Sequence, residues 1–206
     1  MKSTVIPLQS LKAHEKSITS LCIGQRTGLV YATGGEDSNL NLWMVGNSSP
    51  IVCLGPFPSP VTSCIFSDSE NEICCGNQGG SVILFDLNSS KILNNWSSHP
   101  SAINCLCYNP VDRMKTWYSC GDDGTIRVLS TSSKTPIKTI RAHDGPVNFL
   151  TISPDGRYAA SAGKDKKVKI FDLNTFSEIQ TFTKHTDSAT CVQFHPKLPL
   201  LISGGC

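Results

Sequence analysis

The sequence predicts an all-β fold, a β-propeller with four blades and the first half of a fifth. Two observations support this prediction. One pattern of short apolar runs separated by turn residues recurs about every 42 residues, and no stretch of useful length has helical periodicity. Repeats of about 40 residues with four short strands each are typical of propellers, in which every repeat forms one four-stranded blade.

The repeats are aligned by the residues that end their third strands. These residues are spaced by 42, 44 and 42 positions, and they are Trp43, Phe85, Leu129 and Phe171. Six positions earlier lies the corner between the second and third strands, occupied by Asp37, Gly79, Asp123 and Asp165. A histidine precedes most of the first strands, giving the series His14, Phe57, His99, His143 and His185.

This alignment sets the predicted organisation of the chain. A strand within residues 1–12 is restricted to a sheet edge because Pro7 cannot donate a backbone hydrogen bond. The blades then span residues 13–54, 55–97, 98–140, 141–182 and 183–206, and their first strands are predicted at 18–23, 61–66, 103–108, 147–152 and 189–194. Asp155-Gly156 is the clearest hairpin turn. Because an open arc leaves unpaired strand edges, we expect this chain to be a fragment, a truncated product or one part of a longer chain.

The composition argues against several classes of function. Charged residues make up 17% of the chain and the net charge is +2, which does not favour nucleic-acid binding. Apolar runs stay far shorter than the ~20 residues that a membrane helix needs, so membrane insertion is not expected. The N-terminus lacks the apolar core of a secretory signal, which indicates a cytoplasmic or nuclear protein. The glycines of residues 76–80 precede neither a helix nor a lysine, and no cofactor is expected.

Ten cysteines are present, most of them within predicted strands. Without a secretory signal, reduced and buried thiols are expected rather than disulfides. Cys105 and Cys107 share one face of a strand near His99 and are an alternative partial metal site. No second pair has ligand spacing, so core packing is favoured and no metal is predicted.

Four positions in each repeat resemble the WD-repeat family. In that family a His, a Ser or Thr that ends the second strand, the corner Asp and the Trp of the third strand form a buried hydrogen-bonded network. The resemblance implies structural relays formed by His14, Thr33, Asp37 and Trp43; by His99, Ser119 and Asp123; by His143, Ser161 and Asp165; and by His185 and Ser203. Blade 2 has lost the set. Because only blade 1 is complete, Asp37→Ala is expected to cost more stability than any other corner change.

These His, Ser and Asp sets also resemble catalytic triads. They recur at the same register in successive blades, however, whereas an active site occurs once. We therefore predict a structural role for them and no catalytic residue.

Binding surfaces on this fold usually lie along the rim where the corners turn. The residues before the corners are Glu36, Gln78, Asp122 and Lys164, and they change from acidic to basic around the arc. This pattern suits a protein ligand better than a small molecule. Lys164 begins a lysine-rich stretch that is either a solvated edge or a basic patch for an acidic protein surface.

Residues 11–43 and 77–93 resemble the first two blades of the WD-repeat regulatory subunits of katanin, a microtubule-severing complex. Points of likeness are "AH" at residues 13–14, "ATGGEDSNLNLW" at residues 32–43, and "KIL" at residues 91–93. The resemblance implies microtubule-associated proteins and the katanin catalytic subunit as partners, at microtubules, spindle poles or the centrosome. The chain has no segment that resembles the family's C-terminal helical domain, so the resemblance covers the targeting propeller only.

The function predicted from the sequence is therefore that of a non-catalytic protein-interaction scaffold of the katanin regulatory type. Another WD-repeat adaptor, in ubiquitin ligation or vesicle traffic, is the first alternative. A propeller hydrolase is the second, and it requires an unpaired histidine or a carboxylate cluster lining the centre of the ring.

Overall fold

The computed structural model describes residues 10–109, 111 and 115–206. Every regular element in these residues is a β-strand. The strands form four antiparallel sheets of four strands and one sheet of two strands. The predicted all-β fold, an incomplete β-propeller, is confirmed. The strand predicted within residues 1–12 lies mainly outside the described residues.

Each of the first two blades consists of consecutive strands paired in chain order. The strands of blade 1 are β1 (Ile18–Ile23), β2 (Val30–Gly35), β3 (Leu40–Met44) and β4 (Val52–Leu54). Those of blade 2 are β5 (Val61–Phe66), β6 (Glu72–Asn77), β7 (Ser81–Asp86) and β8 (Lys91–Ser97).

The later blades repeat this meander. Blade 3 contains β9 (Ile103–Tyr108), β10 (Trp117–Gly121), β11 (Thr125–Leu129) and β12 (Lys138–Arg141). Blade 4 contains β13 (Val147–Ile152), β14 (Tyr158–Gly163), β15 (Val168–Asp172) and β16 (Ser177–Phe182). The half-blade contains β17 (Ala189–Phe194) and β18 (Leu201–Gly205). All five predicted first strands have the bounds that the sequence indicated.

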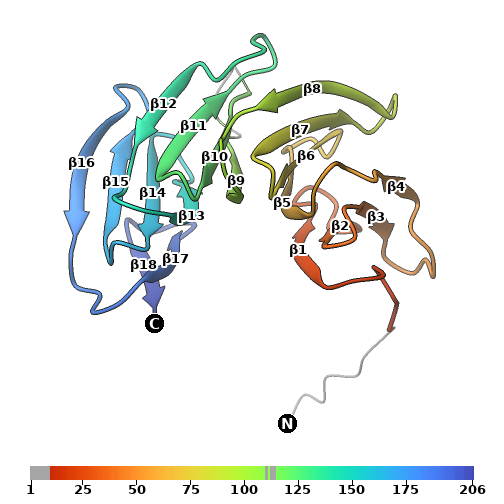
Figure 1. Cartoon of the computed structure of the whole chain (residues 1–206), viewed down its shortest axis with the longest axis horizontal. Helices are drawn as coiled ribbons and strands as arrows, with labels where there is room; N and C mark the ends of the chain where they lie inside the picture. The colour runs from red at the N-terminus through yellow and green to blue at the C-terminus, as the bar shows by residue number, and fades with distance from the viewer. Residues whose placement is uncertain (1–9, 110, 112–114) are drawn as a thin grey trace.

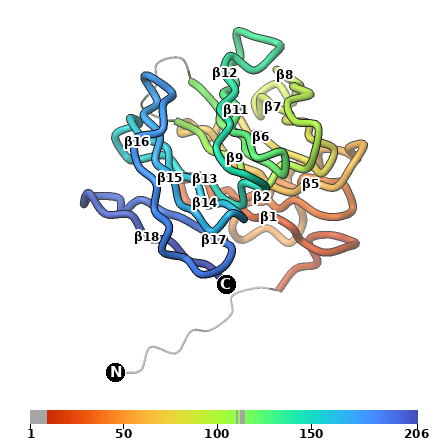
Figure 2. The backbone as a smooth tube through the Cα atoms, turned by 60° about the vertical axis from the view of Figure 1, so that its left-hand side comes forward, coloured from red at the N-terminus to blue at the C-terminus, as the bar shows by residue number. Residues whose placement is uncertain are grey.

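The sheets follow one another around an arc, from the red β1 to the blue β18 (Figures 1 and 2). The first strands lie side by side along its inner edge, with β1 next to β5, β5 next to β9, β9 next to β13 and β13 next to β17. The fourth strands β4, β8, β12 and β16 lie along the outside. The corners between second and third strands therefore lie on one face of the arc, one in each of blades 1 to 4.

The core lies between neighbouring blades rather than within each one. Its four apolar clusters each join strands of adjacent sheets. This arrangement follows from the alternation of side chains along a strand, which gives every blade two faces to bury. No helix in the described part of the chain is long and apolar enough to cross a membrane.

The turn between β13 and β14 shows how local sequence sets the strand pairing. Gly156 has a φ of 69°, a left-handed conformation that glycine adopts without strain. Its N–H donates to the carbonyl of Ser153 at 2.8 Å. The hairpin predicted at Asp155-Gly156 is thus confirmed, and it places Leu150 opposite Ser161.

Candidate interaction rim and the polar networks beneath it

Blade 1 brings its four predicted relay residues into one hydrogen-bonded chain. The indole Nε1 of Trp43 donates to Oγ1 of Thr33 at 2.9 Å, and that hydroxyl lies 2.9 Å from Nε2 of His14. The other imidazole nitrogen, Nδ1, lies 2.9 Å from Oδ1 of Asp37. Since the carboxylate is only an acceptor, Nδ1 carries a proton and donates to Asp37, while Nε2 also lies 3.0 Å from the carbonyl oxygen of Thr33. Asp37 also accepts the backbone N–H of Glu15 at 3.0 Å.

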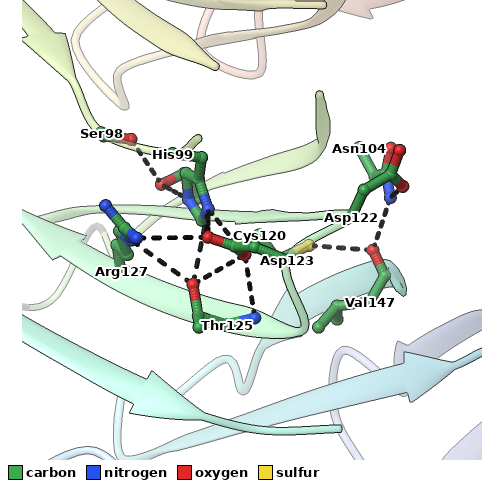
Figure 3. A network of polar contacts seen from close by, with 10 residues as sticks. Ser98, His99, Asn104, Cys120, Asp122, Asp123, Thr125, Arg127 and Val147 are labelled. Carbon is green, nitrogen blue, oxygen red and sulfur yellow. Dashed lines mark hydrogen bonds and ion pairs between the residues drawn. The ribbon is translucent and has the colours of Figure 1, made fainter. Parts of the chain in front are cut away.

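Blade 3 holds its corner aspartate with a larger set of partners (Figure 3). Nδ1 of His99 lies 3.0 Å from both carboxylate oxygens of Asp123, and Nε2 lies 2.9 Å from the hydroxyl of Ser119. The hydroxyl of Thr125 donates to Asp123 at 2.8 Å, and Arg127 forms an ion pair with it at 3.2 Å. Thr125 and Arg127 were not predicted from the sequence, because nothing in the repeat pattern marks them.

The remaining relay residues are also placed together. In blade 4, His143 lies 2.8 Å from Asp165 and 2.7 Å from the hydroxyl of Ser161. In the half-blade, Nε2 of His185 lies 2.8 Å from the hydroxyl of Ser203. Every predicted histidine therefore contacts its predicted hydroxyl.

Blade 2 replaces the polar set with an aromatic contact. Phe57 packs against Phe85 with ring centroids 5.8 Å apart. At the corner, the hydroxyl of Ser59 accepts the N–H of Gly79 at 3.0 Å, and Oδ1 of Asn77 accepts that of Ser81 at 3.0 Å. Asn77 thus satisfies the N–H that the corner aspartate satisfies in blades 1, 3 and 4, and Ser59 satisfies a further N–H of the corner. The sequence predicted the loss of the set but not these substitutes.

The relays set the charge states of their members. Burial alone would raise the pKa of Asp123, but hydrogen bonds from Thr125 and His99 outweigh it and hold the pKa below its usual range. Burial would likewise raise the pKa values of Asp37 and Asp165. The contacts with His14 and His143 outweigh burial, so both pKa values are lowered. Burial lowers the pKa of His99 and of His143, against the attraction of their aspartates. Both imidazoles are therefore neutral at pH 7.

The relay hydroxyls are not placed to act as nucleophiles. Ser119 and Ser161 are 0% exposed, and Thr33 is 3% exposed. A substrate has to reach the attacking oxygen, and these oxygens lie inside the sheets, bonded to imidazoles. The geometry therefore favours a structural function for the three triads.

The central cavity offers little catalytic chemistry either. Its volume is about 790 Å³, and it is lined by the five first strands and the turns that follow β1 and β5. Among the described residues, its lining includes one carboxylate, Asp68, and no histidine. The hydrolase alternative required an unpaired histidine or a carboxylate cluster at this place.

The thiols are core residues for the most part, and all ten are free. Cys105 and Cys107 both direct their sulfurs at the carbonyl of Leu150, at 3.4 and 2.9 Å. His99 instead contacts Asp123 and Ser119. In the described part of the chain, no group of three or more His, Cys, Asp or Glu is placed to hold a metal ion.

The four rim residues occupy one equivalent position, defined by a shared backbone hydrogen bond. The N–H at this position donates to the carbonyl that precedes the first strand of the same blade, over 2.9 to 3.1 Å. All four side chains are exposed, and the series is Glu36, Gln78, Asp122 and Lys164. The rim thus carries two acidic groups, one neutral group and one basic group at regular spacing around the arc.

The lysine-rich stretch that starts at Lys164 is partly neutralised. Lys169 forms an ion pair with Glu178 at 2.8 Å, and Lys166 donates to the carbonyl of Thr186 at 2.9 Å. The ion pair therefore offsets the charge of Lys169, and the contact with Thr186 fixes the position of the Lys166 ammonium without neutralising it.

A second set of polar side chains, not predicted from the sequence, joins the blades along the inner edge. Asn104 on β9 donates to the carbonyl of Val147 on β13 at 2.9 Å. Asn148 on β13 donates in the same way to Ala189 on β17 at 2.7 Å. Thr19 on β1 donates to Val61 on β5. Each of these residues is the second residue of the first strand of its blade. A comparison of that position across the repeats could have identified them from the sequence.

Comparison with known protein families identifies the repeat. The WD domain, G-beta repeat profile matches residues 6–44, 90–130, 134–172 and 176–206, which is more than half of the chain. The chain belongs to the WD-repeat family. The unmatched residues 45–89 contain most of blade 2, whose histidine and corner aspartate positions hold Phe57 and Gly79.

Related WD-repeat proteins have diverse names. The chain is 33% identical over 118 residues to probable coatomer subunit beta' of Schizosaccharomyces pombe, which covers 56% of this chain and 15% of that protein. It is 26% identical to human striatin-4 over 209 residues, covering 95% of this chain and 27% of that one. It is 32% identical to protein NEDD1 of Bos taurus over 135 residues, covering 63% and 20%. The chain therefore spans about a quarter or less of each relative.

Proposed function

We propose that this chain is a non-catalytic protein-interaction scaffold that binds a partner protein across the rim formed by Glu36, Gln78, Asp122 and Lys164. The observation that carries the proposal is their equivalent placement. Four exposed side chains of changing charge are held at one backbone position, and those of blades 1, 3 and 4 lie over buried hydrogen-bonded networks. Charge complementarity across such a surface favours particular partners and suppresses others.

Within this class, the likeness of residues 11–43 and 77–93 to katanin regulatory subunits supports a role in microtubule severing. In this role the rim binds microtubule-associated proteins or the katanin catalytic subunit, in the cytoplasm at microtubules or spindle poles. The chain itself neither severs microtubules nor hydrolyses ATP.

A trafficking adaptor is the second candidate, and the similarity to a probable coatomer subunit favours it. A ubiquitin-ligase adaptor is a third member of the same class. The three differ in the proteins they bind rather than in their folding or chemistry.

Affinity capture on the purified chain tests the proposal. The parent chain is compared as bait with a rim variant that combines Glu36→Lys, Asp122→Lys and Lys164→Glu. A matched control, Asp68→Lys, changes an exposed charge in a turn at the opposite end of the strands and alters the net charge by the same +2 as the rim variant. We expect tubulin-associated proteins, identified by mass spectrometry, to be captured by the parent chain and the control and lost from the rim variant.

Other outcomes separate the candidates. Capture of coat or ligase subunits that is lost in the rim variant would replace the katanin role by an adaptor role and leave the rim as the binding site. Equal capture by the rim variant and the parent chain would show that the rim is not the binding site.

A further inference from the structure

The two open faces of the arc are the two halves of one blade junction. At each of the four junctions inside the chain, the second strand of one blade packs against the first strand of the next. The pairs are β2 with β5, β6 with β9, β10 with β13, and β14 with β17. Among the described residues, this leaves β1 without a preceding second strand and β18 without a following first strand. The two strands lie at opposite ends of the arc (Figure 1).

Strand pairing identifies the residues of the unused half on β1. The position that pairs with the relay hydroxyl, or with Cys75 in blade 2, is the fourth residue of each first strand. In later blades it is apolar and at most 7% exposed, and its occupants are Cys64, Leu106, Leu150 and Val192. In blade 1 it is Leu21, which is 62% exposed.

The first residue of the same strands shows the same contrast. Four occupants, Val61, Ile103, Val147 and Ala189, are 0% exposed. Their equivalent in blade 1, Ile18, is 54% exposed. Two large aliphatic side chains on β1 therefore face solvent at positions that the fold buries everywhere else in the described chain.

The complementary half lies on β18. The residue before the relay hydroxyl position on each second strand is 0 to 2% exposed in blades 1 to 4, where it is Ala32, Cys74, Tyr118 or Ala160. In the half-blade it is Ile202, which is 67% exposed.

These equivalent residues meet one another inside the chain. Ala32 shares an apolar cluster with Val61 and Cys64, and Ala160 shares one with Ala189 and Val192. Cys74 and Tyr118 lie with their counterparts in the other two clusters. The missing fifth cluster would consist of Ile202, Ile18 and Leu21. Neither β1 nor β18 contains a charged residue, so joining them desolvates no charge.

We propose that the chain associates head to tail with a second copy, with β18 of one copy packed against β1 of the other. A second copy is the occupant that fits because each chain presents both halves of the junction that it already makes four times internally. The contact uses different surfaces on the two copies, so it gives either a closed dimer or a longer assembly. Burial of the three aliphatic side chains supplies the driving force.

Mass measurement in solution tests the proposal. The monomer mass is 22.2 kDa, and we expect light scattering or sedimentation to give a higher mass that rises with protein concentration. Leu21→Lys and Ile202→Lys should each yield a monomer over the same range. Because both side chains are exposed in a single copy, the variants should keep the circular dichroism spectrum and melting temperature of the parent chain; Leu21→Ser replaces Leu21→Lys if the latter does not fold.

Mixing the two single variants gives the decisive measurement. Leu21→Lys keeps the β18 face and Ile202→Lys keeps the β1 face, so the mixture should form a 1:1 complex of twice the monomer mass through one intact junction. Ile179→Lys, at a 51% exposed position on β16, is the matched control and should associate like the parent chain.

Three results would overturn the proposal. The first is a parent chain that stays monomeric at every concentration, which would leave the faces to another occupant such as a further blade. The second is self-association of either single variant, which indicates a symmetric or non-specific contact. The third is a mixture of the two variants that remains monomeric.

Discussion

A Cβ atom on Gly163 would lie 2.3 Å from Nδ1 of His143, so the imidazole occupies the space that a side chain would need at this position. The same approach occurs in blade 1, where a Cβ on Gly35 would lie 2.4 Å from Nδ1 of His14. Blade 2 has no histidine, and there Asn77 takes the position of the glycine. The two changes in blade 2 are therefore linked by one steric contact.

Gly163→Ala should destabilise the chain by about 1–3 kcal/mol, because the added methyl group displaces an imidazole held by two hydrogen bonds. Chemical denaturation followed by circular dichroism measures this loss. In a His143→Ala background the same substitution should cost clearly less. An unchanged cost in that background would show that the contact with His143 is not the cause.

Asp123→Ala should cost about 2–4 kcal/mol, at least as much as Asp37→Ala. The sequence ranked Asp37 first because blade 1 has the only complete relay. Asp123 has the larger set of side-chain partners, however, since its removal strands His99, Thr125 and Arg127 together. Denaturation midpoints of the two variants give the ranking, and a clearly larger loss for Asp37→Ala would restore the order expected from the sequence.

Trp43→Phe should be more destabilising than Trp117→Phe, by about 1 kcal/mol. Both indoles are buried, and both substitutions remove a similar volume. Nε1 of Trp43 donates to Thr33, whereas Nε1 of Trp117 has no hydrogen-bond partner among the described residues. Removing an unsatisfied buried donor is less costly than removing a bonded one. Equal losses in urea titrations followed by circular dichroism would argue against this assignment.

Acid should destabilise the chain in two stages. The pKa values of His99 and His143 are lowered by burial, so the unfolded chain binds more protons and stability falls as the pH drops below about 6.5. The pKa values of Asp37, Asp123 and Asp165 are also lowered, so a second loss begins near pH 4 and continues as the pH passes through their folded values.

Urea denaturation between pH 7.5 and pH 5 measures the first stage, as an unfolding free energy that falls with falling pH because protons are taken up on unfolding. His143→Gln should reduce this slope, whatever it does to stability at pH 7.5. A parent chain with no pH dependence in this range would contradict the burial of neutral imidazoles.

Much of the fold follows from local sequence features. The period near 42 residues, the alternation of apolar side chains and turns such as Asp155-Gly156 located the first strands. These signals are local, because strand pairing within a blade joins segments only a few residues apart in the sequence. The relay partners were implied by the resemblance to the WD-repeat family, carried over to the matching positions of each repeat.

The parts that sequence reasoning missed depend on which side chains approach from elsewhere. Arg127 and Thr125 join Asp123 because β11 carries them to the corner, although Leu129 on the same strand departs from the tryptophan pattern. Ser59 and Asn77 take over at a corner that has lost its aspartate. Asn104 and Asn148 act on the neighbouring blade. A polar residue in a strand has many potential partners, and only the packing of the blades selects one.

The sequence by itself determined the repeat and the strand order, because these depend on spacing and turn chemistry within about 42 residues. The residues of each relay were implied by the resemblance to the WD-repeat family. Only the tertiary structure decided which apolar positions are covered. Leu21 and Val192 are equivalent in the repeat and similar in chemistry, yet one is 62% exposed and the other 1% exposed. The difference arises because burial in this fold requires a neighbouring blade. Whether a neighbour is present depends on where the repeat lies in the arc and not on the sequence of that repeat.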